Sequence, residues 1–197
     1  MKIFKRIQYN APVTLTFAII CLGVLLLGQV LSADAYQRFF SVYSAPFTNP
    51  MTMWRLFSHA LGHANYAHFI GNFMIILLIG PLLEERYGGK WLVIMMVITA
   101  GVTGILHMII TSGVAKMGAS GIVFMLILLS SFNNLQRGRI PLTLILVLLI
   151  FIGNELWSAF GADADNNIAY MSHIVGGLCG AAFGFFVNKE MHTEAAT

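Results

Sequence analysis

Charged residues are scarce in this chain. Asp, Glu, Lys and Arg make up 10% of its 197 residues, whereas hydrophobic residues make up 58%. An average soluble domain carries about 25% charged residues. The scarcity excludes an ordinary soluble domain and indicates a membrane protein. The net charge of +3 follows from basic residues in the loops of such a protein, and nothing in the sequence indicates a nucleic-acid surface.

Cysteine is also rare. The two cysteines, Cys21 and Cys179, both lie in apolar stretches, where a free cysteine behaves as a small hydrophobic residue. We therefore expect packing roles, with no disulfide and no metal site. The sequence also lacks internal repeats and low-complexity segments. We expect one helical domain over residues 1–197, with short tails at about 1–12 and 189–197.

Apolar runs recur along the chain. Their lengths are near the roughly 17–25 residues that a helix needs to cross a bilayer. The six candidates are 13–31, 67–83, 91–111, 118–133, 140–158 and 171–188. The sequence thus predicts an all-α polytopic membrane protein with a bundle of six transmembrane helices. The second, fourth and sixth candidates are short or interrupted by polar residues. We expect the chemistry there, because polar groups in lipid are costly and mark functional sites.

Basic residues are unevenly shared between the two sides of such a bundle. With a cytoplasmic N-terminus, eight of the eleven Lys and Arg residues lie inside, and Arg38, Arg55 and Lys116 lie outside. Cytoplasmic loops are enriched in Lys and Arg. We therefore expect a protein of the plasma (inner) membrane with both termini cytoplasmic. A cleaved signal peptide is the alternative for the first span, but 13–31 exceeds the roughly 7–15 apolar residues of such a peptide.

Two outer connections stand out. The longest, 32–66, is rich in aromatic residues and poor in charge, which suits a segment in the interfacial zone of the bilayer. The second, 161–167, is polar and directly precedes the sixth span. We expect this second connection to be mobile and to act as a lid over the site.

Ser120 is the first candidate for chemistry. It lies in the segment Gly118-Ala119-Ser120-Gly121, near the outer end of the fourth span. The small neighbours let another helix or a substrate backbone approach closely. A serine activated by a nearby base is a nucleophile. The alternative is a serine in a patch of small residues that only packs helices together.

His173 is the candidate base. Gly176 and Gly180 follow it at helical spacing and so lie on its face. The face that carries the imidazole is therefore predicted to pack tightly against another span, which would fix the geometry of a two-residue catalytic site. A neutral imidazole is a suitable base at pH 7. The alternative is a structural histidine that donates to a carbonyl oxygen.

A third polar cluster enters the second span. His68 and Asn72 are four residues apart and so share a helical face, and both can donate a hydrogen bond to a developing oxyanion. His59 and His63 have the same spacing, which invites a zinc interpretation. The segment between them lacks the Glu that a zinc protease uses as general base. We therefore expect structural hydrogen bonds from this pair, and no metal.

These motifs together resemble the bacterial rhomboid intramembrane serine proteases of the basic six-helix form. The matching residues are Trp54, Arg55, His59, His63, His68, Asn72, Glu84, Arg86, Gly118 to Gly121, His173, Gly176 and Gly180. The resemblance implies that Ser120 is the nucleophile and His173 the general base of a Ser–His dyad. It also implies an oxyanion hole made by His68, Asn72 and the Ser120 backbone N–H.

The resemblance assigns further roles. Trp54 and Arg55 would belong to the first outer loop, and Glu84 with Arg86 to a hydrogen-bond network at the cytoplasmic end. The activity implied is endopeptidase cleavage of transmembrane protein substrates at or just below the outer membrane surface, with a small residue such as Ala before the cut. No cofactor is implied.

The chain departs from the family pattern at two positions. Phe124 stands where many members carry a Tyr that stacks on the catalytic imidazole, and Ser172 stands where Ala is common. Phe keeps the ring, so we expect the stacking to survive without the hydroxyl. Ser is as small as Ala for helix packing. Neither change removes a catalytic group.

Two polar residues within spans remain, His107 and Glu155. Glu155 lies near a span end, where its head group can reach the interface, and a gating role is the alternative. A transporter or channel is a rival function, but no polar stripe crosses all the spans and no inverted repeat is visible. A non-catalytic rhomboid-like protein that binds transmembrane clients would be expected to lack Ser120 or His173.

Overall fold

The computed structural model describes residues 8–111, 113–132 and 164–194, with single positions at 142, 145, 146 and 149. Of residues 164–170 and 188–194 it describes the backbone alone. Apart from these single positions, the fifth candidate span lies outside the described residues, as do Glu155 and residues 161–163 of the expected lid.

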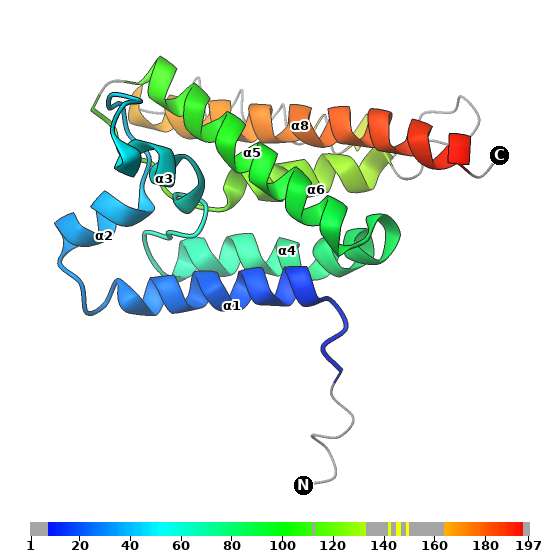
Figure 1. The fold of residues 1–197 in the computed structure, drawn as a ribbon, viewed down its shortest axis with the longest axis horizontal. Helices are drawn as coiled ribbons and strands as arrows, with labels where there is room; N and C mark the ends of the chain where they lie inside the picture. The colour runs from blue at the N-terminus through cyan, green and yellow to red at the C-terminus, as the bar shows by residue number, and fades with distance from the viewer. Residues whose placement is uncertain are drawn as a thin grey trace, which may run out of the picture.

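The described chain is helical. Its helices are α1 (Pro12–Leu27), α2 (Ala33–Phe40), α3 (Pro50–Ser58), α4 (Tyr66–Tyr87), α5 (Gly89–Ile110), α6 (Ser120–Phe132) and α8 (Ala164–Glu194). Within the described ranges no strand forms, and β pairing is limited to one bridge between Val42 and Lys116. The predicted all-α class is confirmed. Figure 1 shows α1 beside α4, and α5 crossing between these helices and α8.

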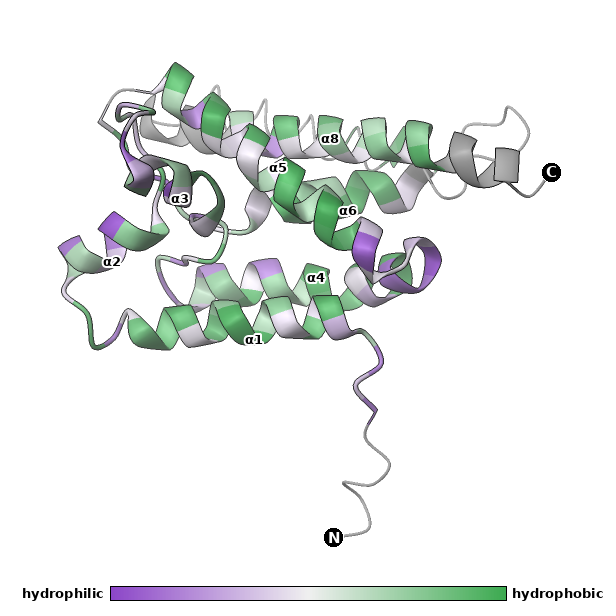
Figure 2. Cartoon of the chain, viewed as in Figure 1, coloured by the Kyte–Doolittle hydropathy of each residue, from purple (hydrophilic) through white to green (hydrophobic). Residues whose placement is uncertain are grey.

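Two helices, α4 and α5, are long and apolar enough to cross a membrane, and α1, α6 and the stretch Met171–Val187 of α8 are shorter apolar helices. Large apolar side chains cover their outer surfaces, as on α4, where Met74, Leu78 and Leu82 are exposed. Figure 2 shows the hydrophobic colour predominating along α1 and α5. A soluble monomer rarely exposes so large an apolar surface. These helices therefore form a bundle whose outer surface faces lipid.

Helix ends differ from the ends of the apolar runs. The run 13–31 continues beyond α1, which ends at Leu27 before Gly28. The last helix begins at Ala164, seven residues before the predicted 171, so four residues of the expected connection 161–167 are helical. Hydropathy marks the part of a helix that is apolar, whereas caps and local backbone geometry set its ends. Asn65, for example, starts α4 by accepting the His68 N–H at 2.8 Å.

Helix α6 lies in the centre of the bundle. It packs against α4, α5 and α8, and its side chains Ile122, Met125, Leu126 and Leu129 are almost fully buried. An α-helix that is apolar on all sides is stable only when surrounded by apolar material. The residue at its start, Ser120, is thereby placed among three other helices.

The connection between α1 and α4 is ordered by side chains that bond to its own backbone. The Trp54 indole N–H and the Ser58 hydroxyl both donate to the Phe39 carbonyl, at 2.9 and 2.6 Å. The Arg55 guanidinium is buried over the Tyr43 ring, 4.0 Å from its centre. Trp54 and Arg55 therefore tie α3 to the residues that precede it, Phe39 and Tyr43.

Candidate active site

The start of α6 positions Ser120. The Gly118 N–H donates to the His59 carbonyl at 2.8 Å, and the Val123 N–H donates to the Ala119 carbonyl at 3.0 Å. Ser120 is thus the first residue of α6. The backbone N–H groups in the first turn of a helix lack intrahelical acceptors, and the helix dipole makes this end positive. The Ser120 N–H therefore stands where a negative oxygen would be stabilised.

Gly118 allows the chain to reach this position. Its φ of +133° is a conformation that L side chains rarely adopt. A Cβ atom here would also lie 2.6 Å from Cε1 of His68. The His68 ring of α4 is therefore packed against the backbone two residues before Ser120, and glycine is required on both counts.

Helices α6 and α8 touch backbone to backbone. A Cβ on Gly176 would lie 2.8 Å from the carbonyl carbon of Gly121, and one on Gly180 would lie 2.9 Å from that of Met125. Gly121 itself faces the Ser172 carbonyl, 3.6 Å from where its Cβ would be. The glycine face of α8 is thus the closely packed one. Because Ser120 adjoins Gly121 and His173 precedes Gly176 by one turn, this contact holds the two candidates at neighbouring positions.

The His173 ring lies on the face of α6 that begins with Ser120. It stacks on Phe124 with ring centres 4.4 Å apart and an interplanar angle of 30°. Phe124 is four residues after Ser120, so the two share a face of α6. The stacking expected for Phe in place of Tyr is present.

Asn72 is a buried donor with no acceptor. It lies one turn after His68 on α4 and is 7% exposed, and its Nδ2 has no hydrogen-bond partner among the described residues. A buried donor without a partner is costly unless a ligand satisfies it. Asn72 and His68 share a face of α4, and the His68 ring packs against Gly118, two residues before Ser120.

His59 and His63 are held by backbone carbonyls. The Nδ1 of His59 bonds the Arg55 carbonyl at 3.1 Å, and that of His63 bonds the Leu61 carbonyl at 3.2 Å. Burial lowers the pKa of His59 to about 3 and that of His63 to about 4. Both rings are therefore neutral at pH 7. Among the described residues, no three His, Cys, Asp or Glu side chains form a group that could hold a metal ion.

Glu84 acts at a distance from the site, about 18 Å along α4 from Asn72 at 1.5 Å per residue. Its carboxylate accepts the N–H groups of Val13 and Thr14 at 2.8 and 2.9 Å, and the Thr14 hydroxyl at 2.8 Å. It therefore caps α1, whose own N-cap, Ala11, has no side-chain acceptor. Arg86 lies near this end with its guanidinium 5.6 Å from the Tyr87 ring centre.

Sequence reasoning assigned no role to Lys116 and His107, two residues that hold the loop before Ser120. Lys116 pairs with Val42 through both backbone hydrogen bonds, at 2.8 and 2.9 Å, in the loop that leads to Ser120. Burial lowers the pKa of Lys116 to about 8. The buried His107 ring bonds the Val114 carbonyl at 2.8 Å and so anchors the same loop. The signal available in the sequence was a lysine four residues before the candidate nucleophile.

These observations define a class of protein: an α-helical membrane bundle with a serine at the start of one helix and a histidine on the facing helix. The family model for the Rhomboid domain matches residues 50–190. The chain belongs to the rhomboid family.

Curated relatives agree with this assignment. The chain is 25% identical over 188 residues to Rhomboid protease GlpG of Haemophilus influenzae, covering 91% of this chain and 93% of the relative. It is 28% identical to the protein of the same name from Klebsiella pneumoniae, over 92% of this chain and 66% of the relative. Rhomboid-related protein 1 of Caenorhabditis elegans is 30% identical over 68% of this chain and 40% of its own length. These matches support a serine intramembrane protease.

Proposed function

We propose that this chain is an intramembrane serine endopeptidase that works through a dyad of Ser120 and His173. The observation that carries the proposal is the backbone contact of α6 and α8 at Gly121 and Gly176, together with the stacking of His173 on Phe124. A dyad has no third residue to orient its base. Here the glycine contact and the aromatic ring supply that orientation.

The reaction follows from these positions. The Ser120 hydroxyl oxygen attacks the peptide carbonyl carbon, and the imidazole of His173 takes the hydroxyl proton. The tetrahedral intermediate collapses when His173 returns the proton to the leaving amine, which breaks the peptide bond. Water, deprotonated by His173, then hydrolyses the acyl-enzyme and regenerates Ser120.

The oxyanion of each tetrahedral intermediate needs donors fixed in advance. We assign this role to the backbone N–H of Ser120 at the start of α6 and to the side chains of Asn72 and His68. The unpartnered Nδ2 of Asn72 supports the assignment, because a substrate oxygen would satisfy it. Removing one such donor costs about 10²–10³ in rate in a well-studied serine protease.

The membrane arrangement in this proposal has six spans, the fifth within 140–158, in a single domain over 1–197. Both termini are cytoplasmic, the site opens on the outer side of the plasma membrane, and the substrates are transmembrane proteins. A helical substrate must unwind locally before its carbonyl meets Ser120, because helix carbonyls are already hydrogen-bonded. Small or helix-breaking residues near the cut should favour cleavage.

The test is cleavage of a single-span test substrate in proteoliposomes by wild type, Ser120→Ala and His173→Ala, combined with labelling by a fluorophosphonate. We expect wild-type cleavage, labelling at Ser120, and loss of both in Ser120→Ala. His173→Ala should lose cleavage while keeping its circular dichroism spectrum. Labelling of folded wild type at another serine, or equal cleavage by all three proteins, would overturn the proposal.

A further inference from the structure

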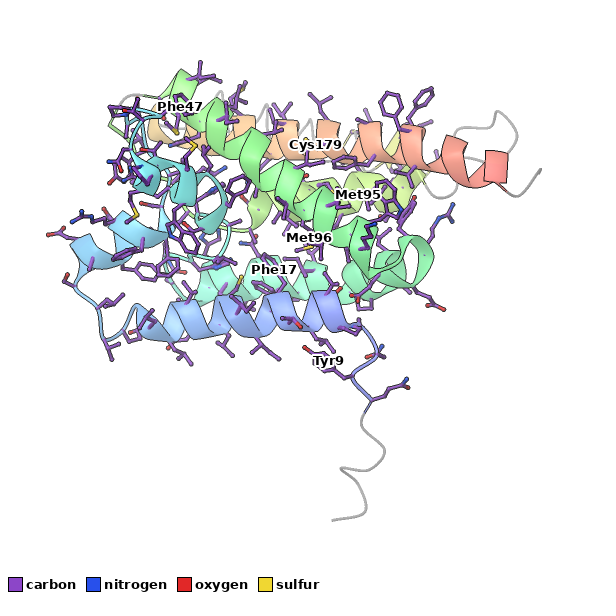
Figure 3. The ribbon with its side chains drawn as sticks, viewed as in Figure 1. Tyr9, Phe17, Phe47, Met95, Met96 and Cys179 are labelled. Atoms are coloured by element: carbon purple, nitrogen blue, oxygen red, sulfur yellow. The ribbon has the colours of Figure 1, made fainter. Side chains whose placement is uncertain are left out.

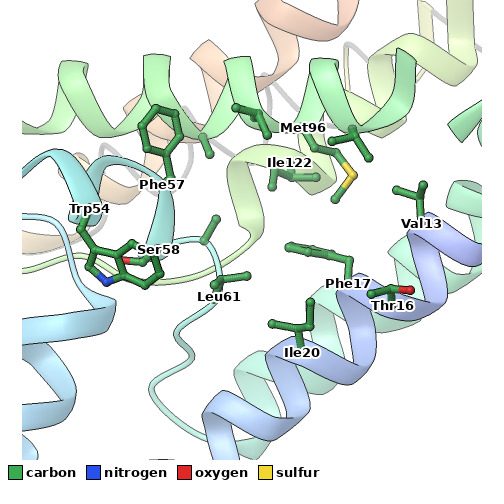
Figure 4. A pocket seen from close by; sticks show the side chains of 14 residues that line it. Val13, Thr16, Phe17, Ile20, Trp54, Phe57, Ser58, Leu61, Met96 and Ile122 are labelled. Atoms are coloured by element: carbon green, nitrogen blue, oxygen red, sulfur yellow. The ribbon is translucent and has the colours of Figure 1, made fainter. Parts of the chain in front are cut away.

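A groove of about 310 Å³ lies between α1 and α5, on a side of the bundle that takes no part in the proposed reaction. Figure 4 shows Phe17 and Ile20 of α1 across from Met96, with Trp54 and Phe57 at one end, and Figure 3 places Phe17 and Met96 between the two helices. We propose that this groove binds one acyl chain of a membrane phospholipid.

The groove follows one stripe of side chains on α1 and one on α5. From α1 it is lined by residues 13, 16, 17 and 20, and from α5 by residues 93, 96, 97 and 100. Each set follows the spacing i, i+3, i+4, i+7, which is one stripe of a helix. A stripe of this length runs for about 10 Å along the helix axis. The groove therefore borders about two turns of each helix.

The lining has no free hydrogen-bonding side chain. Three lining residues carry such groups, and each group is already bonded: the Thr16 hydroxyl to Tyr9 at 2.9 Å, and the Trp54 indole and the Ser58 hydroxyl to the Phe39 carbonyl. A polar ligand would leave its own groups unsatisfied here. The occupant is therefore wholly apolar.

The mouth of the groove is part of the lipid-facing surface. Ile20, Val93 and Val97 line it and are exposed, whereas Ala100 and Met96 on its inner wall are buried. On either side, exposed Ile19 and Ile98 continue the same apolar surface. The groove is thus continuous with the interface that the bundle already makes with lipid tails, and these tails are the molecules at its mouth.

Flexibility favours the acyl chain over a helix, because the groove follows one stripe of α1 and one stripe of α5. A flexible chain can fill a narrow slot and restore the dispersion contacts that an empty one loses. A helix from a second copy of this chain is the alternative occupant, and the experiment below distinguishes the two.

The experiment uses the full chain in phospholipid vesicles that contain a small fraction of phosphatidylcholine with a diazirine within one acyl chain. After irradiation, mass spectrometry locates the adducts. Met96 is 8% exposed, so lipid carbons reach it chiefly through the groove. We expect adducts on Met96 in addition to those on outward-facing residues such as Ile98.

A matched pair of variants on α5 tests the assignment. Val97→Phe narrows the mouth, whereas Val102→Phe makes the same change at a similarly exposed position outside the groove (48% and 39% exposed). We expect Val97→Phe to lower Met96 adducts by about fivefold, because a filled mouth excludes the chain, and Val102→Phe to leave them unchanged. Circular dichroism verifies that both variants fold.

Three outcomes would overturn the proposal. Adducts confined to outward-facing residues in wild type would mean that no lipid chain enters. Equal Met96 adducts in the two variants would mean that lipid reaches Met96 by another route. Met96 adducts that disappear as the protein-to-lipid ratio rises would identify a second copy of this chain as the occupant.

Discussion

Two interfaces of this bundle use opposite means to set the distance between helices. Between α6 and α8, glycines let the backbones touch, and the side chains of Ser120 and His173 flank the contact. Between α1 and α5, Phe17 and Met96 face a groove that the protein does not fill. The tight contact fixes the geometry that catalysis needs. The groove can instead be filled by lipid acyl chains from the bilayer.

One segment joins the two interfaces. Ala60 and Leu61 line the groove, and the adjacent His59 accepts the Gly118 N–H two residues before Ser120. The segment 59–63 therefore supports the site on one side and borders lipid on the other.

The largest expected effect comes from breaking the tight contact. Gly176→Ala drives a Cβ into the Gly121 backbone, which cannot move without shifting α6. A shift of about 1 Å at the site should lower cleavage by about 10²-fold. The control is Gly23→Ala on α1, where a Cβ meets nothing within 4 Å. Cleavage that survives in Gly176→Ala would show that close approach of α6 and α8 is dispensable.

Gly118→Ala should have the next largest effect. It combines strain at φ +133° with a collision against His68, so we expect cleavage to fall by about 10-fold or more. Gly113→Ala separates the two causes, because φ is +81° there but nothing lies within 4 Å. Initial rates on one substrate measure both variants. If the two lose activity equally, backbone strain alone is the cause, and the contact with His68 has no role.

The joining segment predicts a pH dependence of stability. Histidine titrates near pH 6.5 in an unfolded chain. The folded pKa values of His59 and His63 are lower, about 3 and about 4, so these residues stabilise the fold above pH 6.5 and lose that contribution as pH falls toward 4. Between pH 7.5 and pH 5.0, each of these two histidines should lower the free energy of unfolding by about 2 kcal/mol.

Thermal unfolding in detergent at pH 7.5 and 5.0 measures this loss. His63→Gln should show a smaller change between the two pH values than wild type, because one titrating ring is gone. An identical change in both proteins would mean that His63 does not couple folding to protonation.

The smallest effect is expected at the open interface. Ala100→Leu fills part of the groove with apolar side chain in place of lipid, so the free energy of unfolding should change by no more than the roughly 1–3 kcal/mol of overpacking in a filled core. Cleavage should remain close to that of wild type. If Ala100→Leu lost as much activity as Gly176→Ala, the α1–α5 interface would matter to catalysis as much as the α6–α8 contact, which contradicts the comparison.

The sequence predicts the closely packed interface better than the open one. Glycine spacing after His173 predicts the contact face, and the position of Phe124 predicts the ring on the imidazole, because both depend on helical periodicity. The end of α1 at Leu27 and the start of α8 at Ala164 differ from the ends of the apolar runs, because such runs do not mark helix caps. The capping of α1 by Glu84 joins residues 70 positions apart, and local patterns do not reveal such a pair. The groove depends on how α1 and α5 cross, which periodicity alone does not determine.

The central claim is that the Gly176 contact acts by holding His173 toward Ser120. Fluorophosphonate labelling rates of wild type, Gly176→Ala, His173→Ala and the double variant test it as a double-mutant cycle. If the account is right, each single change slows labelling strongly, and adding Gly176→Ala to His173→Ala slows it no further. Two losses that multiply in the double variant would contradict the account, because the glycine would then act independently of the base.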